Sequence, residues 1–326
     1  MKNLKFLSNV KLRLGLIIFL AFVFVFCSIQ IVSVILEKNG DCSLKGHGTK
    51  DSPYLISSKE DLIEFSNLVN GGMLFNNKYV EQTCDIDMAG IDFMPIGIYG
   101  SENVFKGYYN GRGYTISNIS ITTLEGGGNN GLFGFLAGVV MNLNLEGGQI
   151  SGGCCGSFAS HASSFDAMII NCKSTCKIEG IRAGGIADNF NGYVIGCWYY
   201  GEKELPIVSY NAVKIAYSYS NLGQYLPRTF VGECVESGYF ETEYFKSDEF
   251  SALVNSNLPK VANASGINQS TLIDFNNKTP TSLINSPINT LKAYKFHVLG
   301  YVAILASIVV IVISLHKENK GGNSEE

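Results

Sequence analysis

The sequence has little of what enzymes use for acid–base and metal chemistry. Only four of its 326 residues are histidines, and they are scattered: His47, His161, His297 and His316. It contains neither an HExxH pair, which binds catalytic zinc, nor a GxSxG nucleophile elbow. A zinc-finger pattern is also missing, because Cys172 and Cys176 have no second pair at a matching distance. We therefore expect no catalytic residue, no cofactor and no metal site.

Charge is also sparse, at 16% of residues, and its balance is acidic. The whole chain carries 24 Lys and Arg against 28 Asp and Glu. Leaving out six basic and three acidic residues near the two ends, 18 and 25 remain between residues 37 and 297, a net charge of −7. A nucleic-acid-binding face would show the opposite balance, so no DNA or RNA partner is expected.

Two long apolar runs lie near the ends of the chain. Residues 14–36 form 23 residues without a charge, and residues 298–315 form a run of 18. About 20 apolar residues cross a bilayer as a helix, so each run is a candidate transmembrane helix. The first could instead be a cleaved signal peptide, although it is long for one. We expect an uncleaved signal anchor.

Basic residues flank the outer end of each run. Lys and Arg occur within residues 1–13, and His316, Lys317 and Lys320 follow the second run. The positive-inside tendency then places residues 1–13 and 316–326 in the cytoplasm and residues 37–297 outside the cell membrane. The lipid bilayer is thus one expected partner, through both terminal helices.

Glycine is abundant, at 36 residues, and it marks a repeat. A glycine-rich word and a short alternating strand recur three times between residues 131 and 201, and a fourth copy of the strand lies upstream. Measured at Asn118, Asn142, Asn171 and Gly196, the steps are 24, 29 and 25 residues. Such a period predicts stacked repeats, and the period-2 alternation predicts strands. We interpret the glycines as tight corners with positive φ.

Stacking the repeats in register predicts two columns of side chains. Asn118, Asn142 and Asn171 would form a ladder of amides at a turn. The residues that follow the Asn or Gly position, Leu143, Cys172 and Cys197, would line the interior. Eight of nine cysteines lie in residues 37–297, where disulfides are possible. For Cys172 and Cys197 we favour free thiols in a buried core.

The repeat word Gly131-Leu132-Phe133-Gly134 resembles the GLUG-motif repeat of bacterial cell-surface proteins. Residues 105–118 resemble the coil that commonly precedes those repeats, with Asn110 and Tyr114 in place of an Asp and a His. The resemblance covers about residues 48–258. It implies an all-β fold, a right-handed parallel β-helix, displayed on a cell surface and often found in adhesins. It implies no activity.

Helices are predicted at both ends of this β-helix, as caps. Ser57 and Glu60 fit a capping box before a helix whose apolar face is Leu62, Phe65, Leu68 and Val69. Residues 247–254 predict a second capped helix that closes the far end. We therefore assign residues 37–258 to the β-helix with its caps, and residues 259–297, rich in Asn, Ser and Thr, to a stalk.

Four acids, Glu81, Asp85, Asp87 and Asp92, cluster before the first repeat. They could hold calcium in a polysaccharide lyase, but their alternation with apolar residues favours solvent-facing strand positions. The predicted function is therefore a non-catalytic adhesion or interaction module whose partner is an unknown extracellular glycan or protein. The alternative is a carbohydrate-active enzyme of the pectin-lyase type acting on acidic polysaccharide.

Overall fold

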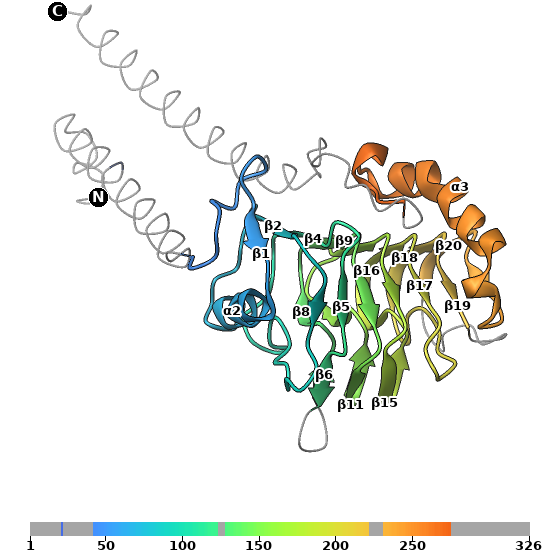
Figure 1. The fold of residues 1–326 in the computed structure, drawn as a ribbon, viewed down its shortest axis with the longest axis horizontal. Helices are drawn as coiled ribbons and strands as arrows, with labels where there is room; N and C mark the ends of the chain where they lie inside the picture. The colour runs from blue at the N-terminus through green and yellow to red at the C-terminus, as the bar shows by residue number, and fades with distance from the viewer. Residues whose placement is uncertain (1–20, 22–41, 123–127, 222–230, 275–326) are drawn as a thin grey trace, which may run out of the picture.

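Parallel strands stack coil upon coil into a β-solenoid (Figure 1). The structure, a computed structural model, describes residue 21 and residues 42–122, 128–221 and 231–274. Every strand pairing given for this part of the chain is parallel, as expected when successive coils run in the same direction. The predicted all-β parallel β-helix is confirmed as a parallel β-solenoid with few helices.

Three sheets form the walls of the solenoid. The ten-stranded sheet contains β1 (Tyr54–Ile56), β2 (Tyr79–Gln82), β4 (Tyr108–Asn110), β9 (Val139–Met141), β13 (Met168–Ile170), β16 (Ala187–Ile195), β18 (Ala212–Ala216) and β20 (Val231–Val235), with β8 (Phe133–Leu136) and β12 (Ala159–Ala162) joined to it through the long β16.

The other two sheets have fewer strands. The seven-stranded sheet contains β3 (Ile86–Asp87), β5 (Thr115–Ser117), β10 (Asn144–Glu146), β14 (Lys173–Ser174), β17 (Trp198–Tyr199), β19 (Tyr219–Ser220) and β21 (Gly238–Tyr239). The four-stranded sheet, at the bottom of Figure 1, contains β6 (Ser120–Thr122), β7 (Asn129–Asn130), β11 (Gln149–Gly156) and β15 (Lys177–Gly184).

The interior is filled by apolar columns that run from coil to coil. Val140, Ile169 and Val194 are paired in register on β9, β13 and β16, and all three are fully buried. A second column, Ile121, Ile150 and Ile178, lines the four-stranded sheet. Each such side chain stabilises the fold by about 1.5–3 kcal/mol through its removal from water.

Helix α2 (Lys59–Asn70) covers the first coil, as predicted for a cap. Its Leu62, Phe65 and Val69 are buried in the same core as the strands. The N-cap is Ser58, whose side chain accepts a hydrogen bond from the Asp61 amide, and not Ser57 as the capping-box pattern suggested. Asp61 is the better reciprocal partner, because its carboxylate reaches back to the Ser57 amide at 2.8 Å.

Helix α3 (Asp248–Ser265) corrects two predictions. It runs 18 residues and contains Pro259, so the proposed boundary between β-helix and stalk falls inside a helix. It also does not close the far end: it lies along the flank of the solenoid, after the short helix η2 (Tyr244–Lys246) (Figure 1). The reason is an outward apolar row on the ten-stranded sheet, including Met141, Ile170 and Ile195, which Val261 and Ala262 cover.

After α3 the chain returns toward the first coils. The short helix η3 (Gln269–Thr271) is followed by Leu272 and Ile273, which are buried against the flank. Ile273 packs beside Gly113, on the coil of β4 and β5, although η2 lies beside the last described coils. We call residues 248–273 the flank clasp. It brings the C-terminal side of the described chain back to the half where the chain enters.

The two predicted transmembrane helices, 14–36 and 298–315, lie outside the described residues apart from residue 21. Within the part that the structure describes, no helix is long and apolar enough to cross a membrane.

Candidate functional site

Asn142 and Asn171 lie side by side at one corner of the solenoid, on adjacent coils. The Asn171 amide nitrogen donates to the Asn142 Oδ1 at 2.8 Å, and the Asn142 amide donates to Asn110 Oδ1 at 3.0 Å. Both residues have positive φ and are buried. Asparagine suits this corner, because it tolerates the left-handed conformation and satisfies buried backbone groups with its amide.

Asn118 does not belong to this ladder, contrary to the prediction. Its neighbours in register follow β3 and β10, at the next corner of the coil, and its amide donates to Asp87 at 2.9 Å. Upstream of Asn142 the row of side-chain hydrogen bonds continues one residue out of register, since Asn110 pairs with Met141 and Glu81 pairs with Asn110. The Glu81 carboxylate bonds the Asn110 amide and Arg112. The mistake arose because both corners need positive φ and both use Asn in similar words.

The glycines of the repeat word serve close packing, not positive φ. Gly131, Gly156 and Gly184 stack on consecutive coils, and none of them has a positive φ. A Cβ on Gly131 would lie 2.7 Å from the Gly156 carbonyl oxygen. Gly134 is equally tight, since its Cβ would meet the Gly97 oxygen at 2.5 Å, while Leu132 and Phe133 are fully buried.

Leu143, Cys172 and Cys197 form an interior column. The pairing of β10 with β14 and of β14 with β17 places them on three consecutive coils, and each is fully buried. Both cysteines are free thiols. Burial raises the pKa of Cys172, and its contact with Cys197 adds to this shift, so the thiol stays protonated.

The four clustered acids have separate partners and do not form one site. Glu81 is buried and pairs with Arg112 at 2.8 Å, so it is not solvent-facing as predicted. Asp85 accepts from the Thr115 amide, and Asp87 from the Ala89 amide. Among the described residues, no three His, Cys, Asp or Glu side chains are grouped so that they could hold a metal ion.

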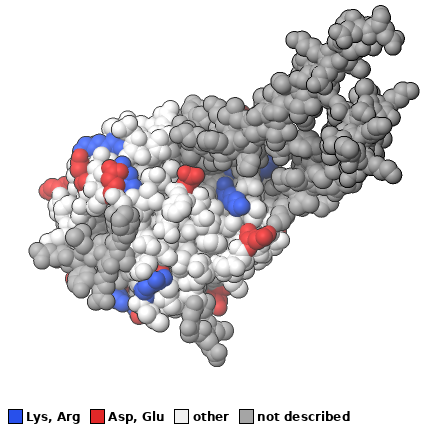
Figure 2. Space-filling view, turned by 180° about the vertical axis from the view of Figure 1, so that it is seen from behind, with Lys and Arg blue, Asp and Glu red and all other residues white. Residues whose placement is uncertain are grey.

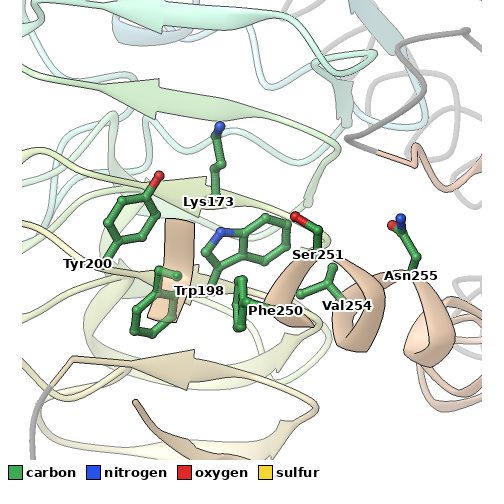
Figure 3. A pocket seen from close by; sticks show the side chains of 8 residues that line it. Lys173, Trp198, Tyr200, Phe250, Ser251, Val254 and Asn255 are labelled. Atoms are coloured by element: carbon green, nitrogen blue, oxygen red, sulfur yellow. The ribbon is translucent and has the colours of Figure 1, made fainter. Parts of the chain in front are cut away.

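A shallow pocket of about 120 Å³ lies between the seven-stranded sheet and α3 (Figure 3). Trp198 and Phe250 form its floor with rings 5.9 Å apart, and Lys173, Ser251 and Asn255 stand at its rim. Its aromatic floor is almost fully buried, and Lys173 pairs with Glu146 at 2.8 Å. These rings therefore join α3 to the solenoid and leave little surface for a ligand.

A second cluster of polar side chains, more exposed than this pocket, lies where the chain passes from the four-stranded sheet to β12 and β16. Arg182 Nη2 donates to Asp188 Oδ2 at 2.9 Å and to Cys154 Sγ at 3.0 Å, and its guanidinium lies 4.8 Å from the Tyr210 ring centroid. Asp188 is fully buried, and burial raises its pKa against the opposing attraction of Arg182. The carboxylate thus fixes an arginine whose side chain is 35% exposed.

His161 lies close to this cluster but is not a base for its thiol. Its Nδ1 is 2.7 Å from Ser160 Oγ, and its ring stacks near Tyr99 with centroids 4.2 Å apart. Burial and the nearby Arg182 lower the pKa of His161 to about 4, so the ring is neutral at pH 7. Burial raises the pKa of Cys154, which works against a thiolate nucleophile.

Beside this cluster, one side chain per coil forms a row across the sheet. Of these, His161 is buried, at 6% exposure, and Phe135, Asn189 and Asn211 are partly exposed. His161 pairs in register with Phe135 on one side and with Asn189 on the other, and Asn211 donates to Asn189 Oδ1 at 3.0 Å. Tyr99 packs over Phe135 and His161, and Tyr210 precedes Asn211 in the sequence. We call these six residues the cross-coil strip: Tyr99, Phe135, His161, Asn189, Tyr210 and Asn211.

The strip has two exposed aromatic rings and an amide-rich middle. Tyr99 is 49% exposed and Tyr210 is 39% exposed. The side chains between them offer hydrogen-bond donors and acceptors without a formal charge, since His161 is neutral and Arg182 is paired with Asp188. α3 covers other faces of the solenoid and packs against none of these six residues.

Sequence analysis missed the strip because of a one-residue register error. Aligning the repeat words by their glycines sets Gly134 opposite Ala159, whereas the structure pairs Phe133 with Ala159. The next pairing, Ala159 with Ala187, agrees with the alignment. The extra residue sits in the turn after Gly156. A shift of one residue exchanges inward and outward positions, so the outward row could not be seen as a column.

Charges on the surface are dispersed. Figure 2 shows Lys, Arg, Asp and Glu in small separate groups of mixed sign, with wide uncharged areas between them. Several are ion pairs between neighbouring coils, such as Lys214 with Glu233 at 3.1 Å. Exposed pairs of this kind contribute little stability, about 0–1 kcal/mol each.

Comparison with known proteins gives partial similarities. No family model matches the chain. It is 34% identical over 132 residues to a "Putative Gly-rich membrane protein" of Evansella cellulosilytica, which covers 38% of this chain and 15% of that protein. It is 38% identical over 120 residues to "Halomucin" of Haloquadratum walsbyi, covering 33% of this chain and 1% of that protein.

Among solved structures, the chain is similar to a "putative immunoglobulin A1 protease" from Bacteroides ovatus. The TM-score is 0.41 at 15% identity, covering 67% of this chain and 91% of the other. The chain thus matches only a small part of each of the two longer relatives in sequence.

The ladder predicts a large difference between two similar asparagines. Asn142→Ala and Asn118→Ala both place alanine at positive φ, so the cost of backbone strain should cancel when the two variants are compared. Asn142 makes four buried hydrogen bonds, to Asn110, Asn171, Thr271 and Ile273. We expect Asn142→Ala to lower the free energy of unfolding by about 2–4 kcal/mol more than Asn118→Ala. Thermal or urea unfolding measures this, and equal effects would contradict the ladder.

The core column predicts selective thiol labelling. Cys172 and Cys197 should resist a maleimide reagent in the folded protein, whereas the exposed Cys234 should react at once. After denaturation all three should react. Peptide mapping by mass spectrometry reads the sites, and rapid native labelling of Cys172 would show that this column is not in the core.

Burial of neutral His161 predicts a loss of stability in acid. Its folded pKa of about 4 lies below that of an unfolded histidine, about 6.5, so the unfolded chain binds the extra proton first. Stability should therefore fall as the pH drops from about 6.5 to about 4, by up to about 3 kcal/mol from this group. His161→Gln should remove that part of the pH dependence. If the free energy of unfolding falls by the same amount with pH in the wild type and in His161→Gln, the prediction is refuted.

Proposed function

We propose that the chain is a membrane-held β-solenoid that acts outside the cell as a non-catalytic adhesion or interaction module. The observation that carries this proposal is the cross-coil strip: aromatic and amide side chains repeat once per coil on a rigid parallel sheet. Tyr99 and Tyr210 remain exposed although α3 covers apolar rows elsewhere. Aromatic rings with polar partners are typical of recognition surfaces.

Membrane attachment rests on the two apolar runs and their basic flanks. The flank clasp supports it, because it returns the chain from the last coils to the coil of Gly113. The described chain thus ends in the same half of the solenoid in which it begins, an arrangement that suits a module held to one membrane. One relative's description as a membrane protein agrees with this proposal.

The GLUG-like words and the solenoid fit together in this proposal. In the word Gly131-Leu132-Phe133-Gly134, a Cβ on either glycine would clash with a neighbouring part of the backbone, and the two large apolar residues between them are fully buried. A right-handed coil is expected, because connections between parallel strands strongly prefer that hand. These features support a surface-display role and specify no reaction.

The lyase alternative would need acids and a basic residue aligned on one face. The acids on which it depended are engaged by separate partners: Glu81 by Arg112, Asp87 by Asn118. No observation among the described residues favours that alternative, so we do not develop it.

The membrane topology of the chain tests the proposed display on the cell surface. A tag at each end and protease added to intact cells should give digestion of residues 37–297 while both tags stay protected. Permeabilised cells are the control, in which both tags should be lost. Digestion of the C-terminal tag in intact cells would contradict a cytoplasmic C-terminus, and full protection of the middle would contradict surface display.

A further inference from the structure

We propose that the cross-coil strip binds an extended, neutral polysaccharide that lies along the solenoid axis, across the coils. This inference rests on the proposed function, since it names the partner of the same surface. Three features of the strip lead to it: its spacing, its lack of net charge, and the exposed rings at its two ends.

The spacing comes from the fold. Phe135, His161, Asn189 and Asn211 stand on four consecutive coils, in register. Neighbouring strands lie about 4.8 Å apart, so the four span about 14 Å. One sugar ring adds a similar length to an extended glycan chain. A short stretch of such a chain can therefore meet Tyr99 above the first two coils and Asn189 and Asn211 on the next two. Longer stretches gain contacts that a disaccharide cannot make.

The charge pattern favours a neutral ligand. The strip's accessible polar groups are amides and phenols, which together donate and accept the hydrogen bonds that sugar hydroxyls need. The buried imidazole of His161 is neutral and adds no charge. Arg182, the cation beside the strip, is compensated by buried Asp188. An acidic polysaccharide would find no uncompensated positive charge here.

The exposed rings provide stacking surfaces. Tyr99 lies over His161 and Phe135 at one end, with centroids 4.2 and 5.4 Å away. Tyr210 is held at the other end by Arg182. Both rings are fixed by these contacts before any ligand arrives, so binding costs little side-chain entropy. The apolar faces of sugar rings pack well on such aromatic surfaces.

Hexasaccharides provide the direct test. The full-length chain, placed in lipid nanodiscs to avoid sugar-headed detergents, is titrated with neutral hexaoses of β-1,4-glucose, β-1,4-mannose and β-1,3-glucose. Hexagalacturonate is the acidic comparison. We expect at least one neutral hexaose to bind, its disaccharide to bind at least about tenfold more weakly, and hexagalacturonate to bind more weakly still. Binding of none of the neutral hexaoses, or equal binding of disaccharide and hexaose, would overturn the proposal.

Variants locate the binding. Tyr99→Ala with Tyr210→Ala should weaken hexaose binding at least about tenfold, and Asn189→Ala about three- to tenfold. Tyr239→Ala is the matched control, because Tyr239 is 48% exposed but lies on β21 of another sheet. It should leave binding unchanged. All variants should unfold at nearly the wild-type temperature, and hexaose binding that is insensitive to the strip variants would overturn the proposal.

A cell-adhesion assay separates this inference from the proposed function. Cells that display the chain are tested on glycoprotein-coated surfaces with and without periodate oxidation of the surface sugars. Loss of adhesion after oxidation, together with loss in the Tyr99 and Tyr210 variant, supports the inference. Adhesion that survives oxidation but is inhibited by a neutral hexaose also supports the inference, because 1,3-linked sugars lack the vicinal diols that periodate cleaves. Strip-dependent adhesion that survives oxidation and is inhibited by none of the neutral hexaoses indicates a protein partner, which overturns the inference but keeps the proposed function. Adhesion that is absent, or independent of the strip, contradicts both.

Discussion

The corner that follows the strands of the ten-stranded sheet sets a conformational constraint on five consecutive coils. At successive coils the backbone there takes positive φ, at Asn142, Asn171, Gly196, Tyr217 and Glu236. Asparagine and glycine meet this demand at low cost, whereas tyrosine and glutamate do not. Where asparagine occurs, its amide also satisfies the neighbouring coil. Where it is lost, another part of the chain must stabilise the corner.

The flank clasp supplies that stabilisation. Lys260 lies 5.6 Å from the Tyr217 ring centroid and pairs with Glu236 at 2.6 Å, so α3 holds the two strained corners directly. Val261 packs on Gly196, and the backbone carbonyls of Thr271 and Ile273 accept hydrogen bonds from the amides of Asn142 and Asn171. At Gly196 the ladder ends, and Asn171 Oδ1 has no partner among the described residues. The corner and the clasp are thus one structural unit.

Sequence reasoning found the repeat but could not find the clasp. The parallel stacking and the interior column of Leu143, Cys172 and Cys197 follow from local alternation and spacing, which short-range sterics determine. The position of α3 depends on an outward apolar row, Met141, Ile170 and Ile195, whose neighbours in space lie far away in sequence. Asn118 was misplaced for a related reason: two corners share the same backbone demand. The strip was hidden by one inserted residue, which reversed the inward and outward faces.

The clasp also determines how the molecule would carry mechanical load. If both ends are held by one membrane, a pull on the cross-coil strip is resisted along two routes. One runs through the first coil and α2, and the other runs through α3 and the Ile273 segment. Along the second route, the hydrogen bonds of Asn142 and Asn171 to that segment would be loaded together rather than one after another. Hydrogen bonds that are loaded in parallel share the applied force. The same asparagines that satisfy the positive-φ corner would therefore also help the module to stay folded under tension.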